Sequence, residues 1–213
     1  MFVKDKMSTD LVTVSPETNI LDALELMRKN NIRRLPVVEG DKLVGMVTEM
    51  DLVRLSPSPA TSLSVFELNY LLAKTKVKDA MTANPITVDS EATVEEAALI
   101  MRTNQIGGLP VVHNGKLVGI ITETNIFDAF IESMGLRRAG TRIAIDVEDH
   151  PGVLADITQV IYKSGIDIIT LATFSGEEGK ARIVVRLAVD SADQLIKELE
   201  SHGYKVAHVA NLH

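Results

Sequence analysis

The sequence contains no cysteine and no tryptophan, and only 4% of its 213 residues are aromatic. Without cysteine, disulfides, thiol nucleophiles and thiolate metal ligands are excluded. The scarcity of aromatic side chains disfavours a platform on which nucleic-acid bases stack. The formal net charge of −7 also argues against nucleic acid as the main partner. Nucleic-acid binding is therefore a disfavoured hypothesis, and we expect no nucleic-acid partner.

Long apolar runs are also missing. No stretch approaches the roughly 18 apolar residues that a membrane-spanning helix needs. The first ten residues, MFVKDKMSTD, lack the apolar core of a signal peptide. We therefore expect a cytoplasmic protein without a membrane partner. The content of 46% hydrophobic and 24% charged residues is ordinary for a globular protein, with length for one large or two small domains.

The dominant feature of the sequence is an internal repeat. Residues 7–54 and 81–128 align without a gap at an offset of 74, and 19 of 46 paired positions between 7/81 and 52/126 are identical. A repeat at a fixed period indicates two copies of one folding unit. We expect the copies to pack as a pseudo-symmetric pair, so that a cleft between them has two related halves.

Each copy has the pattern strand, helix, strand, strand, helix. A β-rich run at Leu11–Val14 predicts the first strand, and helical spacing begins at Ile20 and Val94. Asn19 and Thr93 stand directly before these helices as N-cap residues. Two hairpins follow, with turns at residues 39–41 and 113–115, and a second helix should follow each hairpin.

The remainder of the chain defines the other domain boundaries. A Ser-Pro-Ser-Pro break at residues 56–59 ends the first repeat unit, which we assign to residues 1–60. We expect a connecting helix within residues 61–76, with its amphipathic run at 63–74. The second repeat unit should occupy residues 77–133, and a linker should occupy residues 134–140. A different unit should fill residues 141–213.

The C-terminal unit has its own pattern of elements. Strands are expected at 141–149, 166–174, 181–189 and 204–210, with helices at 151–164 and 192–201. The order βαββαβ is the ferredoxin-like plan. The predicted fold class is therefore α/β (α+β): a pair of β-α-β-β-α units followed by a ferredoxin-like domain.

The repeats resemble a pair of cystathionine-β-synthase-type (CBS) motifs. The resemblance is sharpest in GMVTEMD at residues 45–51, which is similar to the family's nucleotide-binding signature. GIITETN occupies the equivalent place in the second copy, and LPVV precedes each signature at the same distance. The resemblance implies a regulatory pair that binds an adenine nucleotide (AMP, ADP or ATP), alone or with magnesium.

The C-terminal unit looks like an ACT domain, a family of small-molecule sensing modules. The resemblance rests on DHPGVLA at residues 149–155 and GIDI at residues 165–168, within the βαββαβ order. The arrangement of two CBS motifs and one ACT domain is similar to the acetoin utilisation protein AcuB group.

The CBS resemblance implies a main nucleotide site with contributions from both copies. Thr48 would begin a helix, whose N-terminus suits a phosphate, and the Asp51 carboxylate would accept hydrogen bonds from the ribose. Arginine forks can bind phosphate oxygens. The full predicted set is Arg33, Arg34, Val47, Thr48, Asp51, Ile86, Ile106 and Pro110.

A related second site departs from this pattern, because Asn125 replaces the aspartate and Gly107-Gly108 replaces the arginine pair. An amide makes a weaker, uncharged contact with ribose. We therefore predict one good nucleotide site and one weak or empty site. The predicted residues of the weak site are Val12, Ile32, Pro36, Thr122 and Asn125.

Structural interpretations of these residues remain open. Thr48 and Asp51 have the spacing of a helix-capping pair, and capping and ligand binding can coexist. Arg33 and Arg34 could instead form a solvated pair.

A further ligand site in the ACT-like unit would involve Asp149, Gly152, Val153, Leu154, Asp167 and Ile168. In the family, side-chain amides stand near the positions of the two aspartates. A carboxylate there would repel the carboxylate of an amino acid, so the favoured alternative is that this unit pairs with its twin in a homodimer.

No catalytic constellation is present. The five histidines are scattered without metal-ligand spacing, and glycine-rich phosphate loops, nucleophile elbows and HExxH are missing. We expect no enzyme activity, no metal and no required cofactor. The leading hypothesis is a regulatory sensor of adenine nucleotides that acts on a partner protein not yet identified. The alternative is a module in which both domains mainly drive oligomerisation and partner docking.

Overall fold

The computed structural model describes residues 1–55, 72–176 and 179–212. The chain divides into two compact units, Met1–Phe127 and Asp128–His213. Most of the connecting helix expected within residues 61–76 lies outside the described residues, although residues 72–74 are helical. Within the described ranges, the helices are all too short or too polar to cross a membrane.

The first repeat folds as a helix, a hairpin and a second helix. Helix α1 (Ile20–Lys29) precedes strands β1 (Arg34–Glu39) and β2 (Lys42–Thr48), and helix α2 (Glu49–Leu55) begins directly after β2. The strands pair antiparallel up to Glu39 and Lys42, which leaves a two-residue turn. Gly40 in this turn has a φ of +59°, a backbone conformation that glycine adopts without steric cost.

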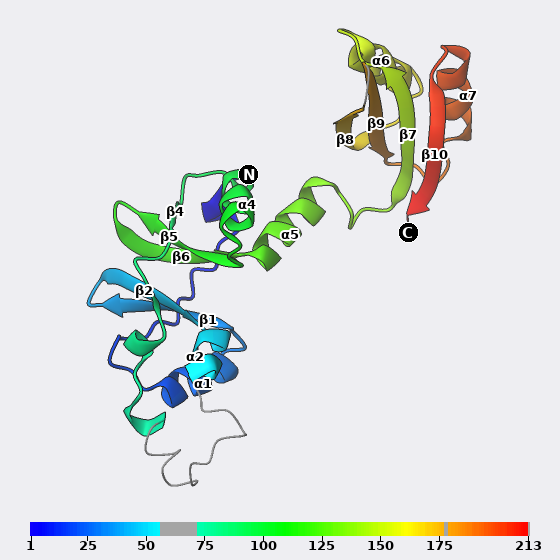
Figure 1. Ribbon diagram of the computed structural model, residues 1–213. Coiled ribbons are helices and arrows are strands. Elements are labelled where there is room, and N and C mark those ends of the chain that lie inside the picture. The colour runs from blue at the N-terminus through cyan, green and yellow to red at the C-terminus, as the bar shows by residue number, and fades with distance from the viewer. Residues whose placement is uncertain (56–71, 177–178, 213) are drawn as a thin grey trace. The chain divides into compact units, whose positions relative to one another are not determined.

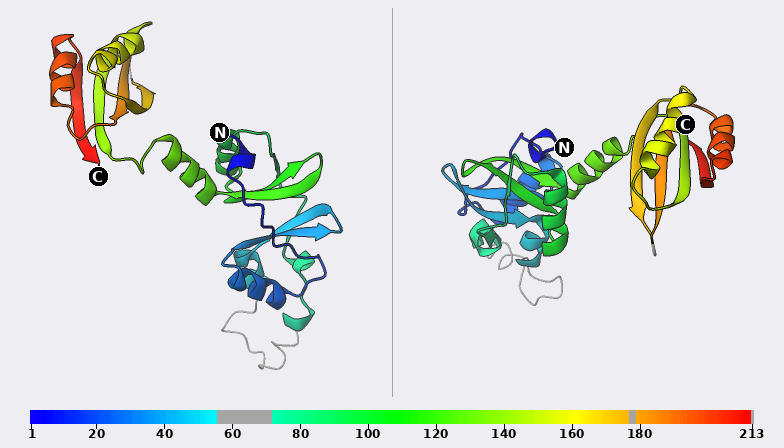
Figure 2. Two further views of the ribbon diagram at one scale, coloured as in Figure 1. Left: turned by 180° about the vertical axis from the view of Figure 1, so that it is seen from behind. Right: turned by 90° about the horizontal axis from the view of Figure 1, so that it is seen from above.

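The second repeat has the same plan. Helix α4 (Val94–Asn104) precedes strands β5 (Gly108–His113) and β6 (Lys116–Thr122), and helix α5 (Glu123–Ser133) follows. In Figure 1 the two hairpins lie side by side, with α1 and α2 next to the first and α4 next to the second. Figure 2 shows the same arrangement of this unit from two further sides.

The expected first strand of each repeat is much reduced. At residues 11–14 it amounts to one parallel bridge between Val14 and Val37. Its counterpart β4 (Val88–Asp89) is a two-residue strand that pairs parallel with β5. A further short strand, β3 (Thr82–Ala83), pairs with β2. The β-propensity of residues 11–14 therefore did not predict the length of the strand, because few of these residues have a backbone partner in a neighbouring strand.

The two predicted N-caps of the repeats are present. The Asn19 side chain accepts a hydrogen bond from the Leu21 N–H at 2.8 Å. Thr93 and Glu96 form a reciprocal capping box, with backbone-to-side-chain bonds of 2.8 and 3.1 Å. These bonds satisfy N–H groups that have no partner within the helix.

Thr93→Ala should lower the free energy of unfolding by about 1 kcal/mol, because the Glu96 N–H loses its acceptor. Chemical denaturation followed by circular dichroism measures this change. Thr93→Ser keeps the hydroxyl and should recover most of the loss. Equal destabilisation by both substitutions would show that the hydroxyl contributes nothing.

The cores of the two repeats are completed by exchanged segments. A 3-10 turn at Val3–Asp5 lies at the start of the first repeat unit, yet its fully buried Val3 packs in the core of the second. The equivalent turn at Val77–Asp79 lies at the start of the second repeat unit, and Val77 packs in the core of the first. Neither core is therefore built from one repeat alone.

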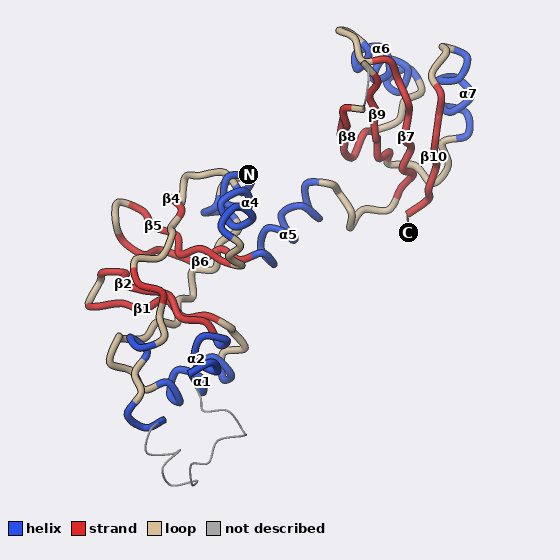
Figure 3. Tube along the Cα trace, in the orientation of Figure 1, coloured by secondary structure: helices blue, strands red, loops and turns tan. Residues whose placement is uncertain are grey.

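The C-terminal unit is a four-stranded antiparallel sheet with two helices (Figure 3). The strand order is β10-β7-β9-β8, which together with two helices gives the predicted ferredoxin-like plan. The elements, in chain order, are β7 (Gly140–Glu148), α6 (Val153–Lys163), β8 (Ile168–Ser175), β9 (Lys180–Leu187), α7 (Asp193–Ser201) and β10 (Lys205–Leu212). The predicted fold class is confirmed for both units.

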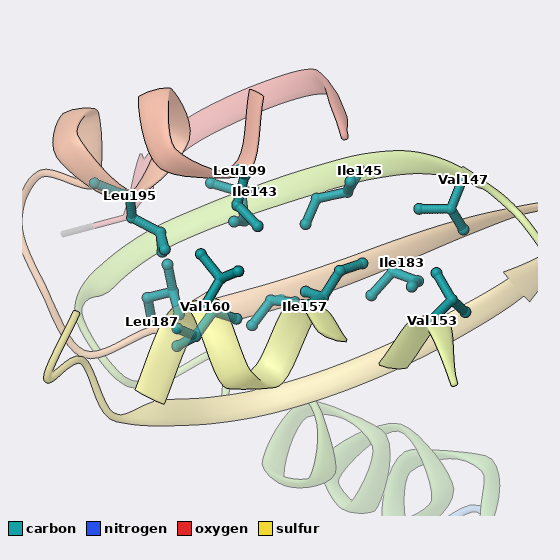
Figure 4. Packing of buried hydrophobic residues seen from close by; sticks show 13 residues of the cluster. Ile143, Ile145, Val147, Val153, Ile157, Val160, Ile183, Leu187, Leu195 and Leu199 are labelled. Carbon is teal, nitrogen blue, oxygen red and sulfur yellow. The ribbon is translucent and has the colours of Figure 1, made fainter. Parts of the chain in front are cut away.

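One hydrophobic cluster holds the helices of this unit to the sheet. Figure 4 shows Ile157 and Val160 of α6 among side chains from β7 and β9, with Leu195 and Leu199 of α7 in the same layer. Ile157 is fully buried. The cluster contains no residue of the N-terminal unit.

Candidate nucleotide-binding site

The first predicted site is centred on the start of α2, where Thr48 and Asp51 bond to each other. The Thr48 hydroxyl and backbone N–H donate to Asp51 Oδ2, at 2.6 and 2.9 Å. The Asp51 N–H donates to the Thr48 hydroxyl at 3.2 Å. The capping interpretation is therefore correct. Since both bonds to the carboxylate use Oδ2, Oδ1 stays available as an acceptor among the described residues.

The start of α5 repeats this geometry with a different chemical group. The Thr122 hydroxyl and N–H donate to Asn125 Oδ1, at 2.7 and 2.8 Å. The amide oxygen takes the place of the Asp51 carboxylate oxygen. The part of the Asn125 side chain that stays available to a ligand is then the Nδ2 amide, a donor, whereas Asp51 offers its Oδ1, an acceptor. The two positions thus offer opposite hydrogen-bonding groups to a ligand.

A pocket of about 510 Å³ lies at the start of α5 and is lined by both repeats. It contains all five residues predicted for the second site and both arginines predicted for the main site. The lining residues are Ser8, Asp10, Leu11, Val12, Asn31, Ile32, Arg33, Arg34, Pro36, Gly107, Ile120, Thr122, Glu123, Thr124 and Asn125.

The other residues predicted for the main site do not line this pocket. Val47 is fully buried in the core of the first repeat, so its side chain cannot contact a ligand. Ile106 packs against the core of the second repeat, and Pro110 is buried within β5. Ile86 is 44% exposed. The arginines thus line this pocket whereas Thr48 and Asp51 do not, although Arg34 is the partner of Thr48 in the pairing of β1 with β2.

Sequence reasoning missed several residues of this pocket. Glu123 and Thr124 lie inside the second signature, at positions that vary freely in the family pattern, and so carried no signal. Ser8 and Asp10 stand in the first repeat but line a pocket at the signature of the second. An antiparallel bridge between Ser8 and Ile120 holds this segment in place. Nothing in the local sequence indicates this pairing.

Arg34 crosses from the first repeat to the second. It begins β1, and its Nη1 donates a hydrogen bond to the Gly107 carbonyl. A Cβ atom built on Gly108 would collide with Nη1 of Arg34 and lie 3.1 Å from its Cδ, and one on Gly107 would lie 2.9 Å from Arg34 Nη2. The two glycines therefore leave the space that the arginine side chain occupies.

The environment of Arg34 holds its charge in a partly desolvated position. Burial lowers the pKa of the Arg34 guanidinium from its ordinary value. The negative charge of Glu123 opposes this shift, and the positive charge of Arg33 adds to it. Desolvation is the larger effect, so Glu123 does not fully compensate the guanidinium.

The backbone N–H groups at the N-terminus of α5 have little capacity left to bind an anion. The N–H groups of Thr122 and Asn125 are taken by the capping bonds, and the Glu123 N–H donates to the Gly107 carbonyl at 3.2 Å. The arginines are therefore the principal groups that could attract an anion. Within the described residues, no cluster of histidine, aspartate or glutamate could hold a metal ion.

The residues predicted for an ACT ligand do not converge on one described pocket. A pocket of about 1070 Å³ in the C-terminal unit includes Val153 but none of the other five. The N-cap residue of helix α6 is Gly152, which has a φ of +101° and makes no side-chain cap hydrogen bond. Leu154 is 39% exposed, whereas Ile168 packs against the core. The Asp167 carbonyl accepts a hydrogen bond from the Ala188 N–H.

The large pocket of the C-terminal unit contains an ion pair of its own. Arg182 donates to both carboxylate oxygens of Asp146, at 2.6 and 3.1 Å. This bond is the main cause that lowers the pKa of Asp146. Both side chains are well exposed, so the pair contributes little to stability.

Comparison with known families identifies both units. Residues 3–58 and 77–132 match the CBS domain family, and residues 139–210 match the TTHA0829-like ACT domain family. The chain is 36% identical to a CBS domain-containing protein of Dictyostelium discoideum over 134 residues, which are 62% of this chain and 92% of the relative. It also matches an inosine-5'-monophosphate dehydrogenase of Korarchaeum cryptofilum at 42% identity, over 55% of this chain but only 22% of the enzyme.

Three solved structures are similar to the N-terminal part. CBSX2 of Arabidopsis thaliana in complex with AMP has 35% identity and a TM-score of 0.52, over 62% of this chain and 97% of that chain. The CBS pair of protein MJ0100 with 5'-methylthioadenosine and S-adenosylmethionine has 30% identity and a TM-score of 0.50, over 61% and 99%. A Vibrio cholerae protein assigned to acetoin utilization (AcuB) has 30% identity and a TM-score of 0.53, over 64% and 95%.

Proposed function

Because the chain belongs to the CBS domain family and carries a TTHA0829-like ACT domain after its CBS pair, we propose that it is a non-catalytic regulatory protein that binds adenine nucleotides. The observation that carries the proposal is the pocket of about 510 Å³ lined by both repeats, with two arginines in its wall. Guanidinium groups bind phosphate oxygens through paired hydrogen bonds. The AMP and S-adenosylmethionine complexes of similar CBS pairs support adenosine as the common ligand.

Two nucleotide positions follow from the pseudo-symmetry of the pair. At one, the free Asp51 carboxylate oxygen would accept hydrogen bonds from ribose hydroxyls, between apolar walls from Ile86 and Ile106 and the backbone at Pro110. At the other, Asn125 would donate its amide hydrogens to the same hydroxyls. A charged acceptor forms the stronger hydrogen bond, so the ribose is bound more tightly at Asp51. Calorimetry that found two equal sites would contradict this asymmetry.

The ACT domain would serve as the dimerisation module. Asp149 and Asp167 would repel the carboxylate of an amino acid, which makes a second, amino-acid-like ligand the less favoured role. Nucleotide binding would shift the population of two arrangements of a homodimer through different affinity for each, and a partner protein would read that state. The competing function is an assembly module in which neither domain binds a small ligand.

AMP, ADP, ATP or S-adenosylmethionine should raise the melting temperature of the protein if the sensor proposal is correct. A ligand at 100 times its dissociation constant adds about 2.7 kcal/mol of stability, which corresponds to several degrees. Asp51→Ala should diminish the shift, because the ribose loses its acceptor. Thermal denaturation followed by circular dichroism suits a chain without tryptophan.

The control for this experiment is Asp41→Ala, which removes an equal charge from the exposed β1–β2 turn and should leave the ligand shift intact. A wild-type protein whose melting temperature responds to none of the four ligands would contradict nucleotide sensing and favour the assembly function. A full shift in Asp51→Ala would instead exclude Asp51 as a ribose contact.

A further inference from the structure

A methionine at the start of each repeat unit lies against the first glycine of the signature in the other unit. Met7 and Met81 are equivalent at the offset of 74 residues, as are Gly45 and Gly119. The Met7 sulfur occupies the space that a Cβ atom on Gly119 would fill, and Met7 packs against the core of the second repeat. Met81 has the same relation to Gly45 and to the core of the first repeat. We call each of these contacts a methionine latch.

Backbone hydrogen bonds accompany the latch at Gly119. The Ser8 N–H donates to the Ile120 carbonyl at 2.9 Å, and the Ile120 N–H donates to the Ser8 carbonyl at 3.0 Å. A Cβ atom on Gly119 would also lie 3.1 Å from the Ser8 carbonyl oxygen. Only a residue without a side chain therefore lets Met7 and Ser8 approach β6 this closely.

The segment that follows Met7 forms one wall of the pocket at the start of α5. The pocket lining includes four of its residues: Ser8, Asp10, Leu11 and Val12. The latch and the Ser8 bonds fix one end of this wall to the second repeat, and the bridge between Val14 and Val37 fixes the other end to the first. Leu11 and Val12 lie between these two anchors and are half-buried. Such apolar side chains suit the flat face of a purine.

The segment that follows Met81 repeats this arrangement. Residues 82 and 83 form β3, which pairs with β2, as Ser8 pairs with β6. Ile86, a predicted wall residue of the site at Asp51, comes three residues later. Each latch therefore stands directly before the segment that belongs to one of the two proposed nucleotide positions.

We infer that Met7 is a positioning residue of the pocket at Asn125: its latch on Gly119 sets where the wall of residues 8–12 lies, and thereby the affinity for adenosine compounds. Met81, through Gly45, has the same role at the site of Asp51. This inference rests on the proposed function and adds the residue that positions each site. Gly119 does not itself line the pocket, so the first glycine of the signature acts through the methionine that it admits.

Isothermal titration of the full chain with adenosine and with AMP, resolved into two sites, tests the inference. Met7→Ala should weaken the site at Asn125 by about tenfold, because a wall that has lost its latch must be ordered on binding. The loss should be equal for both ligands, because an apolar wall contacts the base that they share. The site at Asp51 should keep its affinity. Met81→Ala should give the reverse result.

Two further variants separate positioning from a general loss of structure. Met7→Leu keeps an apolar side chain of similar size and should retain most of the affinity. Met134→Ala removes the same side chain from the C-terminal unit and should leave both sites unchanged. Circular dichroism confirms that each variant is folded before the titration.

Gly119→Ala tests the latch without changing the methionine. The added methyl group would displace the Met7 sulfur, so the affinity of the site at Asn125 should again fall by about tenfold. In the Met7→Ala background the space beside residue 119 is free, so the same alanine should have little further effect. Additive losses in this double-mutant cycle would refute the latch.

The outcomes distinguish this inference from the proposed function. Equal weakening of both sites by Met7→Ala would show that this methionine only supports the fold, which overturns the inference and leaves nucleotide sensing intact. Unchanged affinities in both methionine variants would overturn it as well. If the wild-type protein binds one equivalent of ligand, only one of the two variants should lose affinity, and losses in both would contradict the inference. Binding of neither ligand by a folded wild-type protein would refute the proposed function and this inference together.

Discussion

Val77→Asp should unfold the first repeat, although Val77 belongs by sequence to the second. The side chain is fully buried in the cluster that contains Ile20, Leu35 and Leu52. A carboxylate without a partner in such an environment should lower the free energy of unfolding by at least about 3–5 kcal/mol. This is a large part of the 5–15 kcal/mol that typically stabilises a domain. Val77→Ala, which only removes methyl groups, should cost about 2 kcal/mol.

Hydrogen exchange read by mass spectrometry locates this effect. Peptides from α1 and β1 should lose protection in Val77→Asp, because these elements share the cluster with residue 77. Leu99→Asp likewise replaces an apolar side chain with aspartate, at a position on α4 that is 67% exposed, and its cost should stay below about 1 kcal/mol. Wild-type protection of α1 and β1 in Val77→Asp would disprove the exchange of segments between the two cores.

Ile157→Ala should lower the stability of the C-terminal unit by about 2–5 kcal/mol. Ile157 of α6 is fully buried in the cluster of Figure 4, and its truncation leaves a cavity that a packed core cannot close completely. Peptides from α6, β7 and β9 should exchange faster. Because the cluster draws only on this unit, the thermal response of the CBS pair to nucleotide should persist.

Tyr162→Ala is the control for this prediction. Tyr162 lies on the same helix but is 81% exposed, so its removal should change the free energy of unfolding by no more than about 0.5 kcal/mol. Similar destabilisation by both substitutions would mean that α6 contributes through its helix propensity rather than through the buried face. Loss of the nucleotide response in Ile157→Ala would show that the two units fold as one.

The repeat and the local patterns of the sequence were sufficient to predict most of the fold. The repeat at an offset of 74 predicted two related units, and helical spacing with N-caps at Asn19 and Thr93 predicted where α1 and α4 begin. The turns at Gly40 and Gly115 predicted both hairpins, and the βαββαβ pattern predicted the C-terminal unit. The repeat is visible by comparing the sequence with itself, and the other signals depend on residues a few positions apart, so both can be recognised without knowledge of the tertiary structure.

Local patterns could not predict that the strand expected at residues 11–14 is reduced to a single bridge. They also could not predict that Val3 and Val77 each pack in the core of the other repeat. β-propensity indicates that a segment suits a sheet, but a strand also requires a partner along its length. An apolar residue such as Val77 likewise signals burial without identifying the core that receives it. The sequence separation between such a residue and its contacts removes any local pattern that could reveal the pairing.

The sequence by itself determined the families, the pseudo-symmetry and the chemical difference between Asp51 and Asn125. It also showed that the second repeat carries glycines in place of two arginines. Only the tertiary structure decided which pocket receives the Arg34 guanidinium, because a long side chain can point to either side of its strand. The physical reason is steric: the missing side chains at 107 and 108 open a space in one repeat that the arginine of the other repeat fills.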